Sequence, residues 1–82
     1  MKVMKKFEFH DGANCLFLIM TDTGYLVDVC EREDGGWSVF RGLFACDKSN
    51  YDKALFVFRS FEKFVSEGNS CEDFHISNFN IN

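Results

Sequence analysis

Apolar and polar residues alternate along the first half of the chain, which is the period-two pattern of half-buried β-strands. Four such segments, residues 3–9, 15–20, 25–32 and 37–46, are separated by short polar or glycine-containing stretches. The second segment is instead apolar at every position, as expected for a strand that is covered on two sides or paired in the middle of a sheet. Short connections between consecutive strands favour antiparallel pairing. The pattern therefore predicts an antiparallel meander.

The spacing of apolar residues changes after residue 48, from a period of two to the period of an α-helix. Ser49 is a candidate N-cap with Asp52 three residues later, and Gly68 provides a helix-ending glycine. At 100° per residue, eight apolar side chains share one broad arc: Tyr51, Ala54, Leu55, Val57, Phe58, Phe61, Phe64 and Val65. We therefore predict one long amphipathic helix that packs on one face of the sheet.

The last part of the chain alternates again, with a phase shift between Phe74–Ile76 and Phe79–Ile81. This pattern predicts a fifth strand with a bulge at Ser77 or Asn78. The predicted fold is thus a single α+β domain over residues 1–82, with an antiparallel sheet of four to five strands (β-β-β-β-α-β) and one long helix on one face.

One helix covers only one face of such a sheet. The other face is expected to carry some of the apolar side chains Leu16, Leu18, Met20, Phe40 and Phe44, and Asp28 interrupts one face of its strand. A homodimer or another partner would cover the exposed apolar side chains.

The charge of the chain favours a basic partner. Three of the nine cations, Lys2, Lys5 and Lys6, lie in the first six residues, and residues 7–82 carry a formal charge of −7. Such a surface repels nucleic-acid phosphates, so we expect no direct nucleic-acid binding. The longest apolar run, Cys15–Met20, is too short for a membrane span or a signal peptide. We therefore expect a cytoplasmic protein with no membrane contact.

Residue types that serve catalysis or metal binding are present without a supporting motif. The four cysteines are 15, 16 and 25 residues apart, unlike the close pairs of structural zinc sites, and we expect free thiols. His10-Asp11 and the pair Cys71 and His75 contain acid–base and nucleophile types, but no nucleophile motif or phosphate loop accompanies them. We expect no enzymatic activity, no cofactor and no metal.

A short segment is similar to the RNP1 sequence of RNA-recognition motifs, whose aromatic side chains stack on bases. It reads Arg41-Gly42-Leu43-Phe44-Ala45, but Leu43 stands where an aromatic residue is expected. One predicted helix instead of two, and the negative charge, also argue against RNA binding.

Phe56 lies outside the apolar arc of the predicted helix. Its nearest helical neighbours, three and four residues away, are Asp52, Lys53, Arg59 and Ser60. An aromatic side chain within a polar rim is typical of a protein-binding anchor. The alternatives are an incidental exposed apolar residue or a helix covered on both sides.

The turn between the third and fourth predicted strands is acidic. Glu31, Glu33 and Asp34 precede two glycines, and Trp37 follows directly. The simplest interpretation is a solvated hairpin tip with a core tryptophan. The functional one is an electrostatic contact with a basic groove beside an aromatic anchor.

These features favour a non-catalytic module that binds a larger protein with a basic surface. Small size with acidic and aromatic surface residues is typical of phage or mobile-element inhibitors of host defence, including anti-CRISPR proteins, although no motif carries that likeness. The alternatives are a host regulatory or antitoxin-like partner and a homodimeric domain that binds a small molecule.

Overall fold

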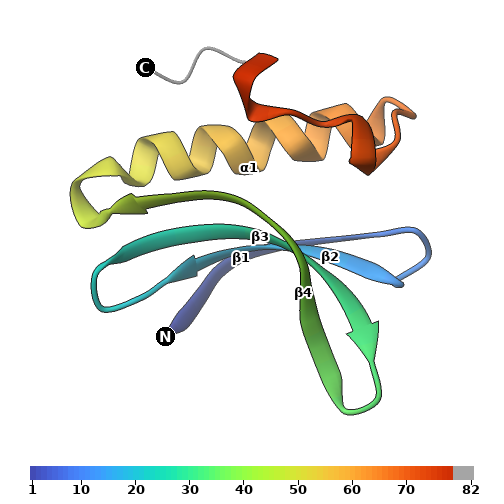
Figure 1. The fold of residues 1–82 in the computed structure, drawn as a ribbon, viewed down its shortest axis with the longest axis horizontal. Coiled ribbons are helices and arrows are strands. Elements are labelled where there is room, and N and C mark those ends of the chain that lie inside the picture. Colours follow the sequence, from blue (N-terminus) through green and yellow to red (C-terminus); the bar gives the residue numbers. More distant parts are fainter. Residues whose placement is uncertain (79–82) are drawn as a thin grey trace.

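The computed structural model describes residues 1–78, and this part of the chain forms one antiparallel sheet and one long helix (Figure 1). Each strand pairs with its neighbours in sequence, in the order β1-β2-β3-β4. The strands are β1 (Lys2–Phe9), β2 (Asn14–Met20), β3 (Gly24–Glu33) and β4 (Gly36–Asp47). The helices are the 3-10 turn η1 (Lys48–Asn50), the α-helix α1 (Tyr51–Ser66), and the 3-10 turns η2 (Cys71–Asp73) and η3 (Ile76–Asn78). The predicted α+β architecture is confirmed.

The hydrophobic core lies between one face of the sheet and α1. The register of β2 and β3 pairs Leu16 with Val29 and Leu18 with Val27, which places these side chains on the same face. All four are buried in one cluster with four residues of the helix, namely Ala54, Val57, Phe58 and Phe61. The apolar arc of α1 therefore meets the apolar face of the two central strands, as its period predicts.

The uncovered face is expected to carry some of Leu16, Leu18, Met20, Phe40 and Phe44, and for Leu16, Leu18 and Phe44 this expectation is wrong. Leu16 and Leu18 are buried in the core, and Phe44 pairs with Val27 and packs against the same cluster. The physical reason is that β2 is apolar on both faces, so alternation alone leaves two equivalent ways to place it on the helix. The face opposite α1 instead receives the other set of β2 side chains, Cys15, Phe17 and Ile19.

The prediction of Ser49 as the N-cap of the long helix is wrong, because Ser49 lies inside η1. Asp47 caps η1, and its carboxylate accepts a hydrogen bond from the Ser49 backbone N–H at 3.0 Å. The N-cap of α1 itself is Asn50, whose side chain makes no capping hydrogen bond. At the other end Gly68 adopts φ of 95°, and its N–H donates to the carbonyl of Val65. The N–H of Asn69 reaches the carbonyl of Phe64. These two bonds form a Schellman motif, so the predicted glycine stop is confirmed.

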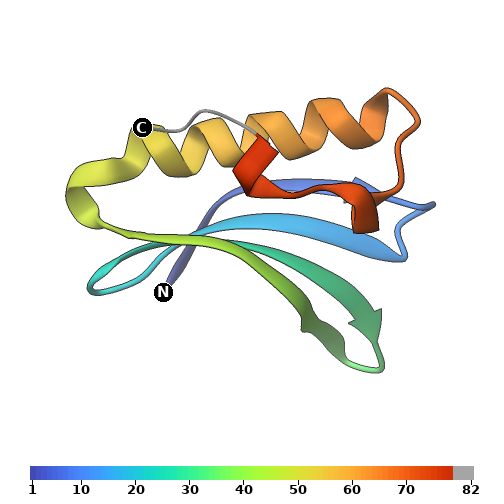
Figure 2. The same ribbon diagram turned by 45° about the horizontal axis from the view of Figure 1, so that its top comes forward.

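The predicted fifth strand is wrong over residues 74–78, which follow η2 and end in η3. Phe74 inserts into the core, edge-on to Phe61 and Phe64. Arg41 of β4 donates hydrogen bonds to the carbonyls of Cys71 and Phe74. These tertiary contacts hold the segment against the helix side of the molecule, where it runs back along α1 (Figure 2). The remaining part of the predicted strand, Phe79 and Ile81, lies outside the described residues.

The β3–β4 hairpin bends away from α1 and projects from the opposite side of the sheet (Figure 1). Its turn contains Gly35 at φ of 85°, in the left-handed region that a tight hairpin turn requires. At the other end of β3, Gly24 allows close approach of β4, since a Cβ there would lie 1.8 Å from the carbonyl oxygen of Cys46. Within residues 1–78, no helix is long and apolar enough to cross a membrane.

Candidate protein-binding surfaces

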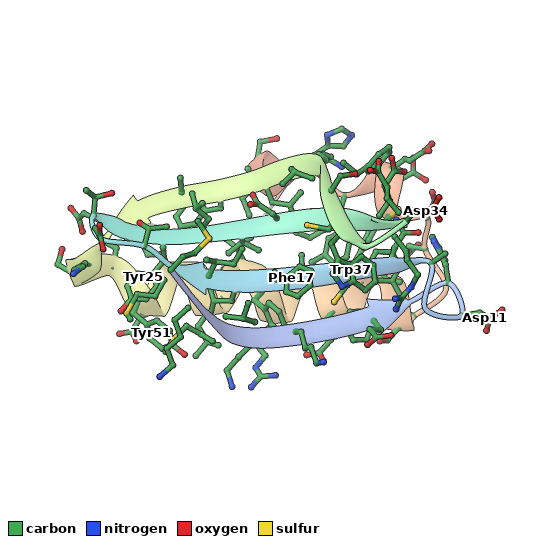
Figure 3. All side chains as sticks on the ribbon, turned by 90° about the horizontal axis from the view of Figure 1, so that it is seen from below. Asp11, Phe17, Tyr25, Asp34, Trp37 and Tyr51 are labelled. Atoms are coloured by element: carbon green, nitrogen blue, oxygen red, sulfur yellow. The ribbon has the colours of Figure 1, made fainter. Side chains whose placement is uncertain are left out.

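The face of the sheet opposite α1 is here called the open face, and Figure 3 views it directly. Its side chains form rows that cross all four strands in register. One row is apolar and contains Val3, Ile19, Leu26 and Ala45. The next row contains Lys6, Phe17, Asp28 and Gly42. Within residues 1–78, no helix or strand covers these rows, because α1 and the segment after it lie on the other face (Figure 2).

Two aromatic residues dominate the open face near the hairpin. Trp37 lies edge-on to Phe17, with ring centroids 5.7 Å apart (Figure 3). The guanidinium of Arg32 lies 4.3 Å from the centre of the Trp37 ring. Arg32 also forms an ion pair with Glu8 at 3.7 Å and donates from Nε to the carbonyl of Gly12 at 3.0 Å. Trp37 is therefore half-buried and held between a ring and a cation, and the positive charge of Arg32 is already paired.

Two cysteines form the buried part of the open face. Cys15 and Cys30 pair across β2 and β3, with 0% and 5% of their surfaces exposed. Their cover comes from neighbouring side chains of this face, since α1 lies behind the sheet. Burial raises the pKa of both thiols, as it does for the half-buried Cys46 and Cys71. All four cysteines are free thiols in the structure, and none has the lowered pKa of a reactive nucleophile.

Asp28 is an acidic residue at the centre of the open face. It pairs in register with Phe17 on one side and Gly42 on the other. Among residues 1–78, no hydrogen bond or ion pair to its carboxylate is present. Desolvation by burial raises the pKa of Asp28 above the ordinary carboxyl value. The sheet therefore holds an unpaired carboxylate whose register neighbours are Phe17 and Gly42.

The acidic turn predicted from the sequence lies at the projecting tip of the hairpin. Glu31, Glu33 and Asp34 are all exposed, and the Ser38 hydroxyl donates to Oε1 of Glu33 at 2.7 Å. Trp37 packs on the open face beside them. The hairpin thus places negative charge at the border of the aromatic surface, on the side of the sheet away from α1 (Figure 3).

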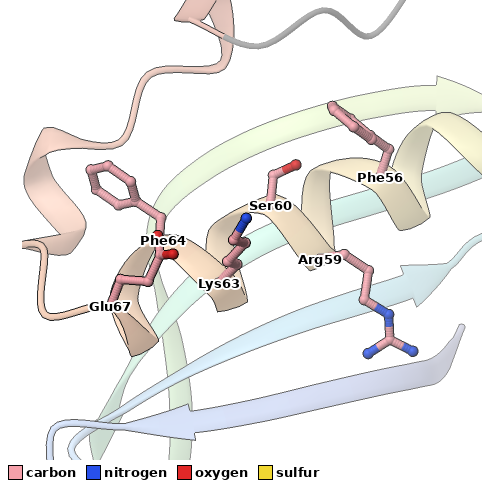
Figure 4. Close-up of a pocket in the computed structure, with 6 residues that line it drawn as sticks. All are labelled: Phe56, Arg59, Ser60, Lys63, Phe64 and Glu67. Atoms are coloured by element: carbon pink, nitrogen blue, oxygen red, sulfur yellow. The ribbon is translucent and has the colours of Figure 1, made fainter.

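A second surface lies on α1. Phe56 is 40% exposed, as its position outside the apolar arc predicts. It lines a groove of about 400 Å³ together with Arg59, Ser60, Lys63, Phe64 and Glu67. Figure 4 shows Phe56, Ser60 and Phe64 along one side of the helix, away from the strands. The groove is therefore an apolar strip bordered by charged side chains.

The predicted rim of Phe56 is only partly present in this groove. Arg59 and Ser60 line it, whereas Asp52 and Lys53 are exposed but do not. Arg59 also pairs with Glu62 at 3.2 Å. The groove extends toward the C-terminal end of α1 through Lys63 and Glu67, which sequence reasoning missed. Their spacing of seven and eleven residues from Phe56 is the helical signal that identifies them.

The structure separates the two groups of predicted binding residues. Phe56, Asp52, Lys53 and Arg59 belong to the helix layer, while the hairpin residues project from the opposite side of the sheet (Figure 1). One flat partner surface does not reach both groups, since the sheet lies between them. The two surfaces are consequently separate candidates.

The structure also places several of the residues considered for metal binding, acid–base chemistry and RNA binding. Within residues 1–78, no three His, Cys, Asp or Glu side chains are placed to share a metal ion. His10 has Nδ1 3.0 Å from Oδ1 of Asn14. In the segment similar to RNP1, Phe44 packs toward the core under α1 and is not presented on the open face. The aromatic platform of an RNA-recognition motif is therefore not formed by this residue.

Comparison with protein-family models, with curated proteins and with solved structures finds no match to this chain. The geometry of the two surfaces is consequently the basis for the function proposed below.

Proposed function

We propose that this chain is a non-catalytic protein-binding module that attaches to a basic surface of a larger protein through its open face and the β3–β4 hairpin. The observation that carries the proposal is the projection of an acidic hairpin tip beside an uncovered, partly apolar sheet face (Figure 3). Apolar area supplies affinity on desolvation, and complementary charge sets orientation and association rate. The formal charge of −7 over residues 7–82 acts in the same direction at longer range.

The same features support the narrower proposal of an inhibitor of the phage or mobile-element type, which acts by covering a functional surface of a host protein. A compact domain that offers two aromatic side chains and an acidic tip needs no catalytic group for such a role. A host regulatory or antitoxin-like partner would use the same surface, and the identity of the bound protein distinguishes these roles.

The groove on α1 favours a second candidate surface. Phe56 is exposed, and the groove's volume of about 400 Å³ is within the usual range for bound side chains or a small ligand. In this alternative α1 is the contact element and the hairpin is a solvated tip.

Affinity purification with matched charge variants tests the two surfaces against each other. The baits are the wild-type chain, Glu31→Lys with Asp34→Lys on the hairpin, and Asp52→Lys with Glu67→Lys on α1, so that both variants change the net charge equally. We expect the wild-type and helix variants to retain one protein at a stoichiometric level, and the hairpin variant to lose it. The retained protein is then purified and the complex is reconstituted and measured by native mass spectrometry.

If the hairpin variant retains the bound protein and the helix variant loses it, the binding site lies on α1. Retention by both variants would contradict the role proposed for the acidic tip. If the reconstituted complex is insensitive to salt, the proposed electrostatic contribution is absent.

A further inference from the structure

We propose that the open face accepts an arginine side chain of the partner, whose guanidinium pairs with Asp28 beside the ring of Phe17. This inference rests on the proposed protein-binding function and adds the chemistry of the contact. Asp28 is half-buried in the middle of the open face, and its carboxylate has no hydrogen bond or ion pair among residues 1–78. A partly desolvated charge without a partner is unfavourable, and a cation supplied from outside would reduce that cost.

The chain's own cations on this face do not fill the role. Arg32 stacks on Trp37 and pairs with Glu8. Lys6 shares the row of Asp28, but β2 and its residue Phe17 lie between them. Lys6 and Asp28 are two strand spacings of about 4.8 Å apart, so roughly 10 Å separates their backbone positions. The negative charge of Asp28 is therefore open to an external partner.

Space beside the carboxylate is provided by the neighbouring strand. Gly42 pairs with Asp28 and has no side chain, and a Cβ built at Gly42 would lie 3.4 Å from Oδ1 of Asp28. On the other side, Phe17 pairs with Asp28 and contacts Trp37. The carboxylate thus lies over the glycine of β4, and its register neighbour on β2 is an aromatic residue.

Arginine fits this arrangement better than lysine. A guanidinium is planar, forms two parallel hydrogen bonds with a carboxylate, and stacks on aromatic rings. The structure already contains one such stacking contact on the same face, between Arg32 and Trp37. The acidic hairpin tip would attract the same basic partner segment before it docks.

A peptide experiment tests this inference even while the partner is unidentified. The immobilised full chain selects from a phage-displayed library of random peptides, and selected peptides are synthesised with arginine or with citrulline, its neutral analogue. Binding is measured from the fluorescence of Trp37, which is the single tryptophan of the chain. The protein variants are Asp28→Asn, Gly42→Val, and Asp22→Asn as a control in an exposed turn.

We expect selected peptides to share an arginine, and citrulline to weaken their binding to the wild-type and Asp22→Asn chains by about tenfold or more. The same exchange should change binding to Asp28→Asn by less than about twofold, because the charge pair is already absent. Gly42→Val should reduce binding of the arginine peptides by crowding the carboxylate. Circular dichroism of each variant checks that the fold is retained.

Four results would overturn the inference. In the peptide experiment they are selected peptides that lack arginine, an equal effect of citrulline on binding to the wild-type and Asp28→Asn chains, and a library from which no peptide binds. The fourth is a wild-type dimer, in sedimentation equilibrium, that Leu26→Asp dissociates, because it would assign the open face to a second copy of the chain. The hairpin charge variants still test the proposed function in each case, since they use the intact partner.

Discussion

The guanidinium carbon of Arg32 lies 4.3 Å from the centre of the Trp37 ring, and this contact joins the end of β3 to the start of β4. The guanidinium of Arg32 also pairs with Glu8, and its Nε donates to the Gly12 carbonyl. One side chain therefore connects the hairpin to β1 and to the turn that follows β1. The orientation of the projecting hairpin therefore depends on a residue at the surface of the molecule.

Arg32→Ala should lower the free energy of unfolding by about 1 to 2 kcal/mol, the sum expected for a cation–π contact and a charged hydrogen bond at an exposed site. Arg59→Ala is the matched control, since both arginine side chains are 55% exposed, and Arg59 has an ion pair with Glu62 and a longer cation–π contact, 5.9 Å from the centre of the Phe58 ring. Its cost should remain under about 0.5 kcal/mol. Urea denaturation measures both, and equal losses would contradict a special role for Arg32.

Asp28→Asn should stabilise the chain near neutral pH. The pKa of Asp28 is raised by burial, so the folded protein retains the proton at pH values where the unfolded chain has released it. The contribution of Asp28 to the free energy of unfolding of the wild-type chain therefore falls as pH rises from the ordinary carboxyl value of 3.8 through the raised pKa. The stability difference between Asp28→Asn and wild type should grow over that window and then level off.

Urea denaturation of both chains between about pH 3.5 and 7 measures this difference, which cancels the titration of other carboxylates. Asp47 is the internal contrast, because hydrogen bonds from Ser49 lower its pKa and act in the opposite direction. A difference that does not change with pH would show that Asp28 is not the group responsible.

The period of apolar residues was sufficient to predict the strands and the helix, because each has a period set by its own backbone. It also placed Phe56 outside the apolar arc, but whether a second layer covers that side of the helix is not a property of the period, and the structure shows Phe56 to be 40% exposed. The period did not determine which face of β2 meets α1. β2 is apolar on both faces, and only pairing with Val27 and Val29 decides that Leu16 and Leu18 face α1.

The segment after α1 and the candidate sites depend on contacts that are distant in sequence. Alternation in residues 74–78 resembles a strand, but Arg41 holds the carbonyl of Phe74 from a position more than thirty residues earlier. Strand pairing places Asp28 between Phe17 and Gly42, neither of which has a side chain that can pair with a carboxylate. Local patterns contain neither piece of information.

The cysteines should differ in their reaction with a thiol reagent in the native state. Cys46 and Cys71 are half-buried, whereas Cys15 and Cys30 are buried in the open face. We expect the first two to be modified early and the second two only as fast as the structure opens. Burial raises the pKa of all four thiols, so every rate should be below that of the unfolded chain.

Mass spectrometry of samples taken during the reaction identifies the modified residues, and urea should expose four reactive thiols. If Cys15 reacts as quickly as Cys71 in the folded protein, the open face is not packed as the structure indicates.

Phe61 and Phe56 provide the sharpest comparison within α1, because they are five residues apart and differ in burial from 0% to 40% exposed. Phe61 packs edge-on against Phe9 and Phe74, with ring centroids 5.5 and 5.2 Å apart. Phe61→Ala should therefore cost about 3 to 5 kcal/mol, which would unfold a marginally stable domain of this size.

Phe56→Asp should keep the melting temperature within a few degrees of wild type, since the side chain lies at the surface groove with Arg59 and Lys63. A matched Phe40→Asp variant places the same charge at an exposed phenylalanine of β4. If α1 is the contact element, only Phe56→Asp loses the partner. If the open face is used, Phe56→Asp retains the partner, and a large drop in its melting temperature would show that Phe56 belongs to the core.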